Sequence, residues 1–284
     1  MKKIILLILL AAMTVYGQLD DRRLLSSQRL PGINPDSYLS KPVQLIDMPT
    51  ASILRGGDIK TSIRLFEQGG ALGRLSVGIS SKMMFGVSFG GTHVIGNQTI
   101  KWNDNPGIHF MYRLVEETLT MPAIVLGFDS QGYGAWWDNV PSLNVPENGE
   151  PQLVSDRYTH KSPGLFIVAS KGYSSLVKFG VHGGINYSLE DSDGDDDPNI
   201  FSAMDVLLSR DIALIFEYDF AINDDTVRGE NNGNGYLNAG VRWAFTDYMF
   251  IEFDFKNLLE KKNNENDKVE PQRILKFVYY GSIR

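Results

Sequence analysis

The feature that most constrains the fold is a series of segments in which apolar side chains occupy every second position. The clearest example lies at 211–220. Its even-numbered positions are all apolar or aromatic: Ile212, Leu214, Phe216, Tyr218 and Phe220. The odd-numbered positions end in two carboxylates, Glu217 and Asp219. Successive side chains of a strand point to opposite faces, so this segment has one apolar and one polar face. In a soluble sandwich the apolar face would point inward, whereas in an outer-membrane barrel it faces lipid and the charges face the lumen.

Segments of this kind recur along the chain. They predict an all-β fold, a closed antiparallel transmembrane β-barrel of about 12 strands. Most of them are close to the roughly 9–11 residues that a tilted membrane strand needs. An even strand number is expected when both ends of a bacterial barrel lie on the same side. The strands are predicted at 58–67, 73–80, 83–92, 106–114, 119–128, 163–171, 175–187, 199–208, 211–221, 235–244, 247–256 and 273–282.

The lengths of the connections test the barrel independently. One set is short, at 81–82, 115–118, 172–174, 209–210 and 245–246. The alternate set is longer, at 93–105, 129–162, 188–198, 222–234 and 257–272, with the short connection 68–72 as its exception. Short turns on one side and long loops on the other are typical of outer-membrane barrels, with the short turns in the periplasm.

The first residues predict export. Lys2 and Lys3 precede an apolar run at 4–13, and small residues up to Gly17 suit a cleavage site, which is the pattern of a signal peptide. The run is too short for a membrane-spanning helix. The chain contains no cysteine, so its fold must rest on packing and backbone pairing. The predicted divisions are a signal peptide at 1–17, a short irregular periplasmic arm or lumen plug at 18–50, and the barrel at 51–284.

Composition excludes one class of partner. The chain has 27 Lys and Arg residues against 34 Asp and Glu residues, a formal net charge of −7. Nonspecific binding to nucleic acid needs basic patches, so nucleic acid is not an expected partner. The expected surroundings are the lipids of the outer membrane of a Gram-negative-type bacterium.

The alternation of odd and even positions along each strand also predicts which charged side chains point into the barrel. The lumen collects both signs, and buried charges persist only when they are paired or hydrated. A salt-bridged, plugged interior and a polar conduit both satisfy this condition. Side chains fill much of the interior of so small a barrel, which favours the plugged interior. The predicted lumen charges are Arg64, Arg74, Arg113, Lys178, His182, Glu217, Asp219, Arg242, Glu252 and Asp254.

An acidic loop at 190–198 is the candidate for a cofactor site. Clustered carboxylates around Gly194 can wrap a hard cation such as Ca²⁺ through oxygen ligands. The spacing does not match the full EF-hand pattern, and the alternative is a solvated loop of mutually repelling charges. The candidate calcium ligands are Asp191, Asp193, Asp195 and Asp197, and no other cofactor is predicted.

Catalysis is not predicted. Acyl transfer needs a nucleophile beside a base and a third group that orients the base. Ser76 and Ser88 are the serines that can be imagined near His109, but no local motif supports either pair. A lone histidine in the lumen is more often a hydrogen-bonded filler than a base.

Short stretches of the chain resemble the YjbH-type family. The segment Met48-Pro49-Thr50-Ala51, followed by Gly56-Gly57-Asp58, resembles that family's entry into its first strand. The stretch Phe216-Glu217-Tyr218-Asp219 resembles a later Glu-Tyr-Asp element of the family. The resemblance implies an outer-membrane β-barrel linked to exopolysaccharide production or export. It carries over no catalytic residues, and full-length members are far longer than this chain.

These observations lead to one main function and two alternatives. The main prediction is a non-enzymatic outer-membrane barrel that assists exopolysaccharide secretion or envelope assembly, with polysaccharide or assembly proteins as partners. The alternative is a passive channel or transporter for small solutes, and a third class is an outer-membrane hydrolase. Conductance in a planar bilayer separates the first two, because a plugged structural barrel would be silent.

Overall fold

The computed structural model describes residues 39, 41–137, 140–141, 153–154, 157–174, 177–224, 234–259 and 271–283. The predicted signal peptide at 1–17 lies outside these residues. Nearly all the regular structure in the described part of the chain is β-strand. None of the helices found there is long and apolar enough to cross a membrane.

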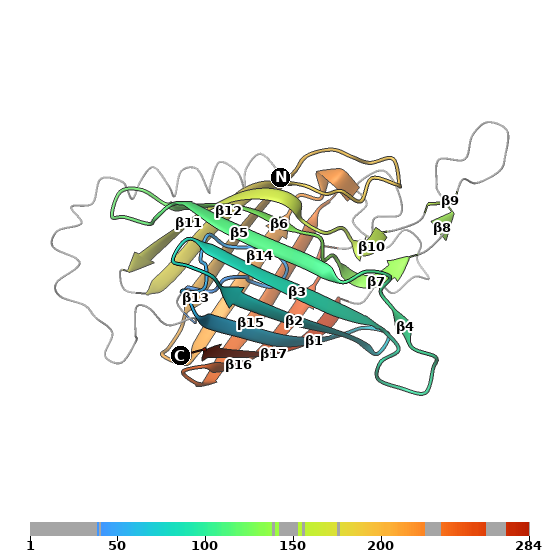
Figure 1. Ribbon diagram of the computed structural model, residues 1–284, viewed down its shortest axis with the longest axis horizontal. Helices are drawn as coiled ribbons and strands as arrows, with labels where there is room; N and C mark the ends of the chain where they lie inside the picture. The colour runs from blue at the N-terminus through green and yellow to red at the C-terminus, as the bar shows by residue number, and fades with distance from the viewer. Residues whose placement is uncertain are drawn as a thin grey trace.

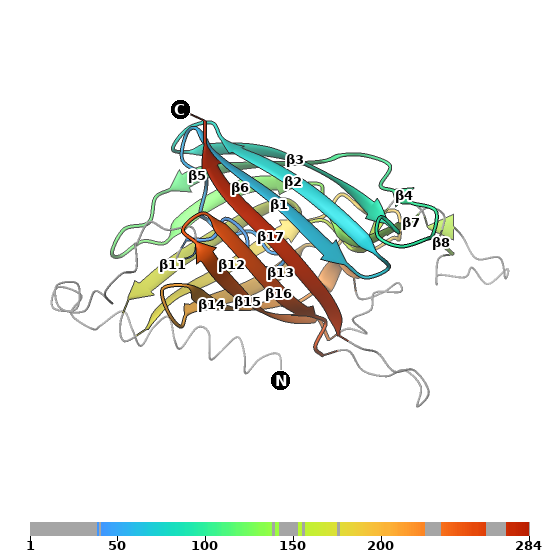
Figure 2. The same cartoon turned by 90° about the horizontal axis from the view of Figure 1, so that it is seen from below.

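Twelve long antiparallel strands close into a barrel, which confirms the predicted fold class (Figures 1 and 2). The first strand pairs with the second on one side and with the last on the other, so the wall has no free edge. The wall strands are β1 (Asp58–Phe66), β2 (Gly70–Gly78), β3 (Met83–Thr92), β5 (Gly107–Val115), β6 (Ala123–Asp129), β11 (Gly164–Ser174), β12 (Lys178–Tyr187), β13 (Asn199–Leu207), β14 (Ile212–Asp219), β15 (Tyr236–Thr246), β16 (Met249–Lys256) and β17 (Gln272–Ser282).

The connections alternate in length as the sequence predicts. We call one end of the barrel the short-turn end, where the connections are 79–82, 116–122, 175–177, 208–211 and 247–248. We call the other the long-loop end, where they are 67–69, 93–106, 130–163, 188–198, 220–235 and 257–271. The short elements all belong to these long loops: β4 (Lys101–Trp102), β7 (Tyr133–Trp137), β8 (Val140–Pro141), β9 (Leu153–Val154), β10 (Arg157–His160) and η2 (Ile222–Asp224).

The outer face of the wall is apolar. On β14, Ile212 and Phe216 are exposed while Ala213, Ile215 and Glu217 are buried, which is the predicted parity. The same alternation leaves large apolar side chains exposed around the barrel, including Leu75, Ile108, Ile185, Val241, Phe253 and Phe277. A soluble sandwich would bury these side chains, whereas a lipid-facing wall presents them. The exposed belt therefore identifies the outer surface of a membrane-spanning barrel.

Several strand ends differ from the prediction, including the starts of β2 and β12 and the end of β11, and two further ends have clear local reasons. β6 begins at Ala123 instead of 119, because Pro122 has no N–H and Thr118 and Met121 form a turn through two hydrogen bonds of 3.0 Å. β14 ends at Asp219 instead of 221. Its carboxylate accepts the N–H of Ala221 at 2.9 Å, and Ala221 itself has a positive φ of 47°, outside the extended region.

Replacing Phe253 with arginine tests the lipid-facing assignment. Phe253 lies near the middle of β16 and is 52% exposed. A guanidinium at the bilayer midplane costs a transmembrane barrel about 2–4 kcal/mol, so the free energy of unfolding should fall by that amount. Urea titration of the protein refolded in lipid vesicles measures it, with Phe253→Leu as the control. Equal stability of the two variants would place this face in water.

Candidate functional site

The segment 41–57 is called the lumen hairpin below, because its residues 43–50 pair as a hairpin. The N–H of Thr50 donates to the carbonyl of Val43 at 3.1 Å, and the N–H of Leu45 donates to the carbonyl of Met48 at 3.0 Å. The hairpin makes hydrogen bonds with inward-facing side chains of β1, β11, β14, β15 and β17. These strands lie on different sides of the closed wall, so the hairpin occupies the barrel lumen (Figure 2).

The position of the predicted arm follows from these contacts. The sequence left a periplasmic arm and a lumen plug as alternatives for 18–50, and residues 41–50 take the plug position. Residues 18–38 lie outside the described part of the chain. The wall itself begins at Asp58, where the first strand is predicted, and residues 51–57 lead from the hairpin into it.

Asp47 sits at the turn of the hairpin and is held by charged side chains from several strands. Its carboxylate oxygens lie 2.7 Å from Arg64 Nη1 and 2.6 Å from Lys256 Nζ. The backbone N–H groups of Asp47 and Met48 donate to the carboxylate of Glu217, at 3.0 and 2.9 Å. Hydrogen bonds that involve an ionised partner are roughly twice as strong as neutral ones. The turn is therefore the most firmly held part of the hairpin.

Basic side chains of the wall also hold the carbonyl groups of the hairpin. Arg64 donates to Ile46 O at 3.1 Å, and Lys276 donates to Leu45 O, also at 3.1 Å. Arg242 donates to the carbonyl of Gln44 at 3.0 Å. Behind these cations lies Glu252, which is fully buried and accepts hydrogen bonds from both Arg242 and Lys276. β1, β14, β15, β16 and β17 thus give the hairpin a charged wall.

The hairpin also packs against apolar side chains of the interior. The hairpin side chains Val43, Ala51, Ile53 and Leu54 belong to one buried cluster with side chains from β3, β5, β6 and β11. The wall members of this cluster include Met84, Met111, Ala123, Val125, Phe166 and Val168 on these strands, and Ala213, Ala244, Phe250 and Val278 on β14 to β17. The hairpin therefore packs against apolar side chains around the wall, while the charged groups that bind it lie from β14 to β1.

Most of the predicted lumen charges line this interior. Six of them are buried: Arg64, His182, Glu217, Arg242, Glu252 and Asp254. Arg74 pairs with Asp129 at 2.8 Å, and Asp219 accepts a hydrogen bond of 2.6 Å from Asn199. Arg113 and Lys178 lie instead at the short-turn end, where both are partly exposed. Arg113 faces Glu116 in the adjoining turn at 3.9 Å, which explains why it does not enter the interior.

Several charged lumen residues were missed by the sequence reasoning. Lys60, Lys256 and Lys276 are buried and lie on the inward parity of their strands, so the alternation contained a signal for them. Asp129 ends a strand and Asp47 lies in the hairpin, outside any strand. No periodic signal could have placed Asp47 in the lumen.

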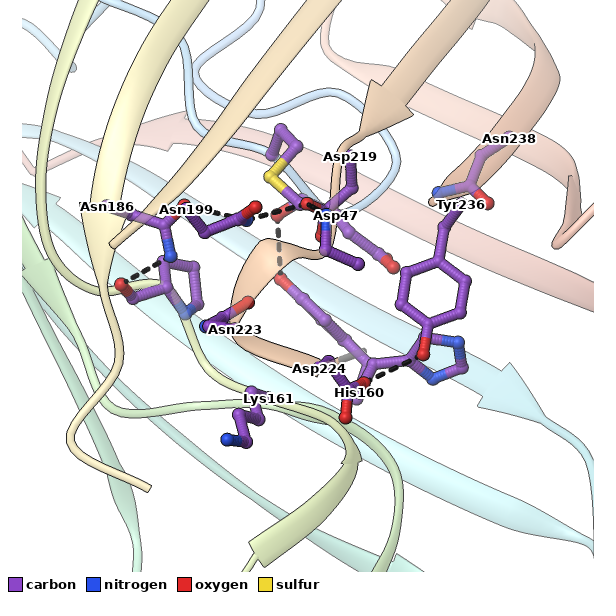
Figure 3. Close-up of a pocket in the computed structure, with 14 residues that line it drawn as sticks. Asp47, His160, Lys161, Asn186, Asn199, Asp219, Asn223, Asp224, Tyr236 and Asn238 are labelled. Atoms are coloured by element: carbon purple, nitrogen blue, oxygen red, sulfur yellow. Dashed lines mark hydrogen bonds between the residues drawn. The ribbon is translucent and has the colours of Figure 1, made fainter. Parts of the chain in front are cut away.

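The long-loop end is covered by the long loops themselves. Tyr133 of β7 donates its hydroxyl to the carbonyl of Asp47 at 3.3 Å. A cavity of about 20 Å³ separates the hairpin turn from this cover, and His160, Asn199 and Tyr236 are among the residues that line it (Figure 3). That volume is enough for a water-sized group. Burial lowers the pKa of His160 well below its usual value, so its ring is neutral near pH 7.

Ion pairs tie three of the long loops together. Arg157 binds both Asp193 and Asp224, and its Nη2 lies 2.8 Å from Asp224 Oδ1. Lys161 lies 2.8 Å from Asp193, and the hydroxyl of Tyr236 donates to Asp224 at 2.7 Å. Burial raises the pKa of Asp224 to about 6, although Arg157 and Tyr236 favour its ionised form.

The predicted calcium loop takes part in this network instead of gathering its own carboxylates. Asp193 is occupied by two cations, while Asp191 and Asp197 are exposed. Asp195 accepts a hydrogen bond from Lys161 at 2.6 Å, through its backbone carbonyl. Within the described ranges, no group of three or more His, Cys, Asp or Glu side chains is arranged to hold a metal ion. Arg157 and Lys161, which come from another loop, neutralise the charge for which the sequence proposed a cation.

Replacing Arg157 with methionine should loosen the cover at the long-loop end. The change leaves Asp193 and Asp224 buried with less compensation, which costs about 3–5 kcal/mol when a buried pair is broken. We expect chymotrypsin to cleave the long loops roughly tenfold faster, because local opening controls proteolysis. Arg210→Ala, which removes an exposed pair with Asp211, is the control. Unchanged cleavage would show that the network does not hold the cover.

Two serine–histidine contacts lie in the lumen. Ser76 Oγ is 2.8 Å from His109 Nε2, but Nδ1 of this ring has no hydrogen-bond partner in the described part of the chain. In the second, Ser170 Oγ is 2.7 Å from His182 Nδ1, and His182 Nε2 is 2.8 Å from Asp205. The N–H of Ala51 donates to Ser170 Oγ at 2.7 Å, so the hairpin covers this hydroxyl. We assign both contacts to the packing of the interior.

Comparison with known proteins adds limited information. No protein-family model matches the chain, and no curated protein matches it in sequence. The relation to the YjbH-type family therefore stays a prediction. Solved structures with a similar barrel include the KdgM porin (TM-score 0.43, 7% identity, 80% of this chain and 99% of that chain). Others are the NanC porin (0.41, 11%, 80% and 99%) and the Acinetobacter baumannii outer membrane protein Omp33 (0.39, 8%, 80% and 97%).

Proposed function

We propose that this protein is an outer-membrane channel for small polar solutes and that the lumen hairpin closes it. The observation that carries the proposal is how the hairpin is held. Charged side chains of the wall bind its turn and its backbone carbonyls: Lys256 pairs with Asp47, Glu217 accepts from the turn, and Lys276 donates to a carbonyl. When the hairpin leaves, water can solvate each of these groups in its place.

The chemistry of the wall supports a wet state of the lumen. Removing charges from water is expensive, and a buried ion pair is often no more stabilising than apolar residues of the same volume. A barrel that served only as a scaffold could pack its interior with apolar side chains alone, whereas this chain keeps buried charges beside its apolar cluster. The charged surface from β14 to β1 is the side along which a polar solute would pass.

The channel is the alternative predicted from the sequence, and it accounts for the lumen better than the main prediction does. A part in exopolysaccharide secretion or envelope assembly stays a prediction, because none of the contacts described above bears on it. No catalytic step is proposed.

A disulfide that locks the hairpin tests the channel. The chain has no cysteine, so Ala51→Cys with Ser170→Cys introduces a single pair. The backbone nitrogen of Ala51 lies 2.7 Å from Ser170 Oγ, so the two residues are neighbours across the lumen contact. In planar bilayers we expect the oxidised variant to be silent. The reduced variant and the wild type should show openings of equal size.

The single variants Ala51→Cys and Ser170→Cys are the controls, because neither can form the bridge. They should conduct in both oxidised and reduced buffer. Silence of the wild type and of the reduced variant, with heat-modifiable gel mobility intact, would favour a permanently plugged structural barrel. Equal conductance of the locked and unlocked forms would show that the hairpin is not the gate.

A further inference from the structure

The buried ammonium group of Lys60 is the strongest unexplained feature of the lumen. Lys60 lies on β1 with its side chain inward and is 6% exposed. Its ammonium group makes no hydrogen bond or ion pair with any residue that the structure describes. The other cations on the same wall are satisfied: Arg74 by Asp129, and Arg242 and Lys276 by Glu252.

The charges around Lys60 make a protonated ammonium group there still less favourable. Three of the charged groups facing it are cations, Arg74, Arg242 and Lys276. Two carboxylates also face it, but Asp129 is already bound to Arg74, and Glu252 to both Arg242 and Lys276. A buried ammonium among other cations must either lose its proton or gain an anion.

There is space for an anion beside Lys60. A cavity of about 20 Å³ borders it on the side of Arg74, Ser76 and His109, and one of about 10 Å³ borders it on the side of Arg242 and Lys276. The larger cavity can hold one group of about the size of water, which suits a halide better than a larger oxyanion. The lining on the β1–β2 side offers hydrogen-bond donors, and the two carboxylates that also line the cavity, Asp47 and Asp129, are each bound to an arginine.

A second donor without a partner lines the same cavity. His109 is 4% exposed, its Nε2 lies 2.8 Å from Ser76 Oγ, and its Nδ1 has no hydrogen-bond partner within the described residues. When the Ser76 hydroxyl donates to Nε2, the proton of the neutral ring lies on Nδ1. His109 then offers an N–H beside the ammonium group of Lys60.

We infer that Lys60 and His109 bind one small anion of the size of chloride in this cavity. The anion supplies the negative charge that the cations of β1, β2, β15 and β17 lack, and it accepts hydrogen bonds from Lys60 Nζ and His109 Nδ1. Arg74 adds a further positive charge at the edge of the site. The site lies beside the lumen hairpin and exists in the closed barrel, so it stands whether or not the barrel conducts.

Chloride binding can be measured directly by ³⁵Cl nuclear magnetic resonance on the full chain in detergent, with chloride as the probe. The wild type should broaden the chloride resonance, and excess bromide should remove most of the broadening by competition. Lys60→Met should reduce the excess linewidth at least fivefold. Lys82→Met, in an exposed turn at the short-turn end, should leave it unchanged.

A second variant keeps the proposal testable if Lys60→Met does not fold. Ser76 lies directly opposite Lys60 in the β1–β2 register, so Ser76→Asp places a fixed carboxylate beside the ammonium group. We expect Ser76→Asp to keep the heat-modifiable gel mobility and to abolish the excess chloride linewidth. Equal linewidths in wild type, Lys60→Met and Ser76→Asp would overturn the assignment. Absence of broadening in the wild type would also overturn it and would leave water beside an uncharged lysine.

Discussion

Replacing Glu252 with alanine should destabilise the folded barrel by about 3–5 kcal/mol, the range measured when one partner of a buried ion pair is removed. Glu252 is fully buried and binds both Arg242 and Lys276. Its loss leaves two cations in the interior with only the carbonyl groups of the lumen hairpin and the more distant Asp254, at 3.7 Å from Lys276. Neither cation can reach bulk water while the barrel is closed.

The measurement is the urea midpoint at which the heat-modifiable band of the refolded protein disappears. Glu117→Ala is the matched control, because Glu117 pairs with Lys171 at 3.9 Å near the surface. An exposed pair of this kind contributes about 1 kcal/mol or less. If the midpoint of Glu252→Ala moved no further than that of Glu117→Ala, the charged wall would not stabilise the closed barrel.

Asp47→Ala should open the channel. The carboxylate of Asp47 holds the hairpin turn through Arg64 and Lys256, and its removal leaves both cations without that partner in the closed state. A hydrogen bond to a charged group is worth about 1.5–3 kcal/mol. A loss of about 3 kcal/mol would change the ratio of closed to open barrels roughly 100-fold.

Single-channel recording in planar bilayers gives the open fraction directly. Ser52→Ala, also in the hairpin, is the control, because Ser52 donates its backbone N–H to Thr50 Oγ1 and this bond does not involve its side chain. We expect its open fraction to match the wild type. An Asp47→Ala barrel that folds and stays as silent as the wild type would contradict the channel. It would leave the hairpin as a permanent part of the interior.

The wall of the barrel was predictable because a membrane imposes a simple rule on every strand. Outward side chains must suit lipid, so Phe216, Phe253 and Phe277 alternate with inward Glu217, Glu252 and Lys276 in a pattern that any one strand displays. Backbone pairing adds the alternation of short and long connections. Both signals are local, which is why the strand positions and most of the lumen charges could be read from the chain.

The identity of the partners inside the lumen was not predictable from such signals. Asp47 contacts Glu217, which lies 170 residues further along the chain. Lys276 and Leu45, which are also hydrogen-bonded, are likewise far apart in the sequence. The calcium site stays a prediction, and the surroundings of its loop could not be predicted for a related reason. Asp193 lies in an acidic stretch, but Arg157 and Lys161 reach it from a loop more than 30 residues away.

The sequence by itself determined a lipid-facing, cysteine-free barrel, since the two faces of each strand are recorded in its alternation of side chains. Only the tertiary structure decided that residues 41–57 enter the lumen and that Lys60 is left without a carboxylate. The hairpin does not show the alternation of a full strand, so the sequence holds no periodic signal for its position in the lumen. Which buried charges meet depends on the closure of the whole wall around them.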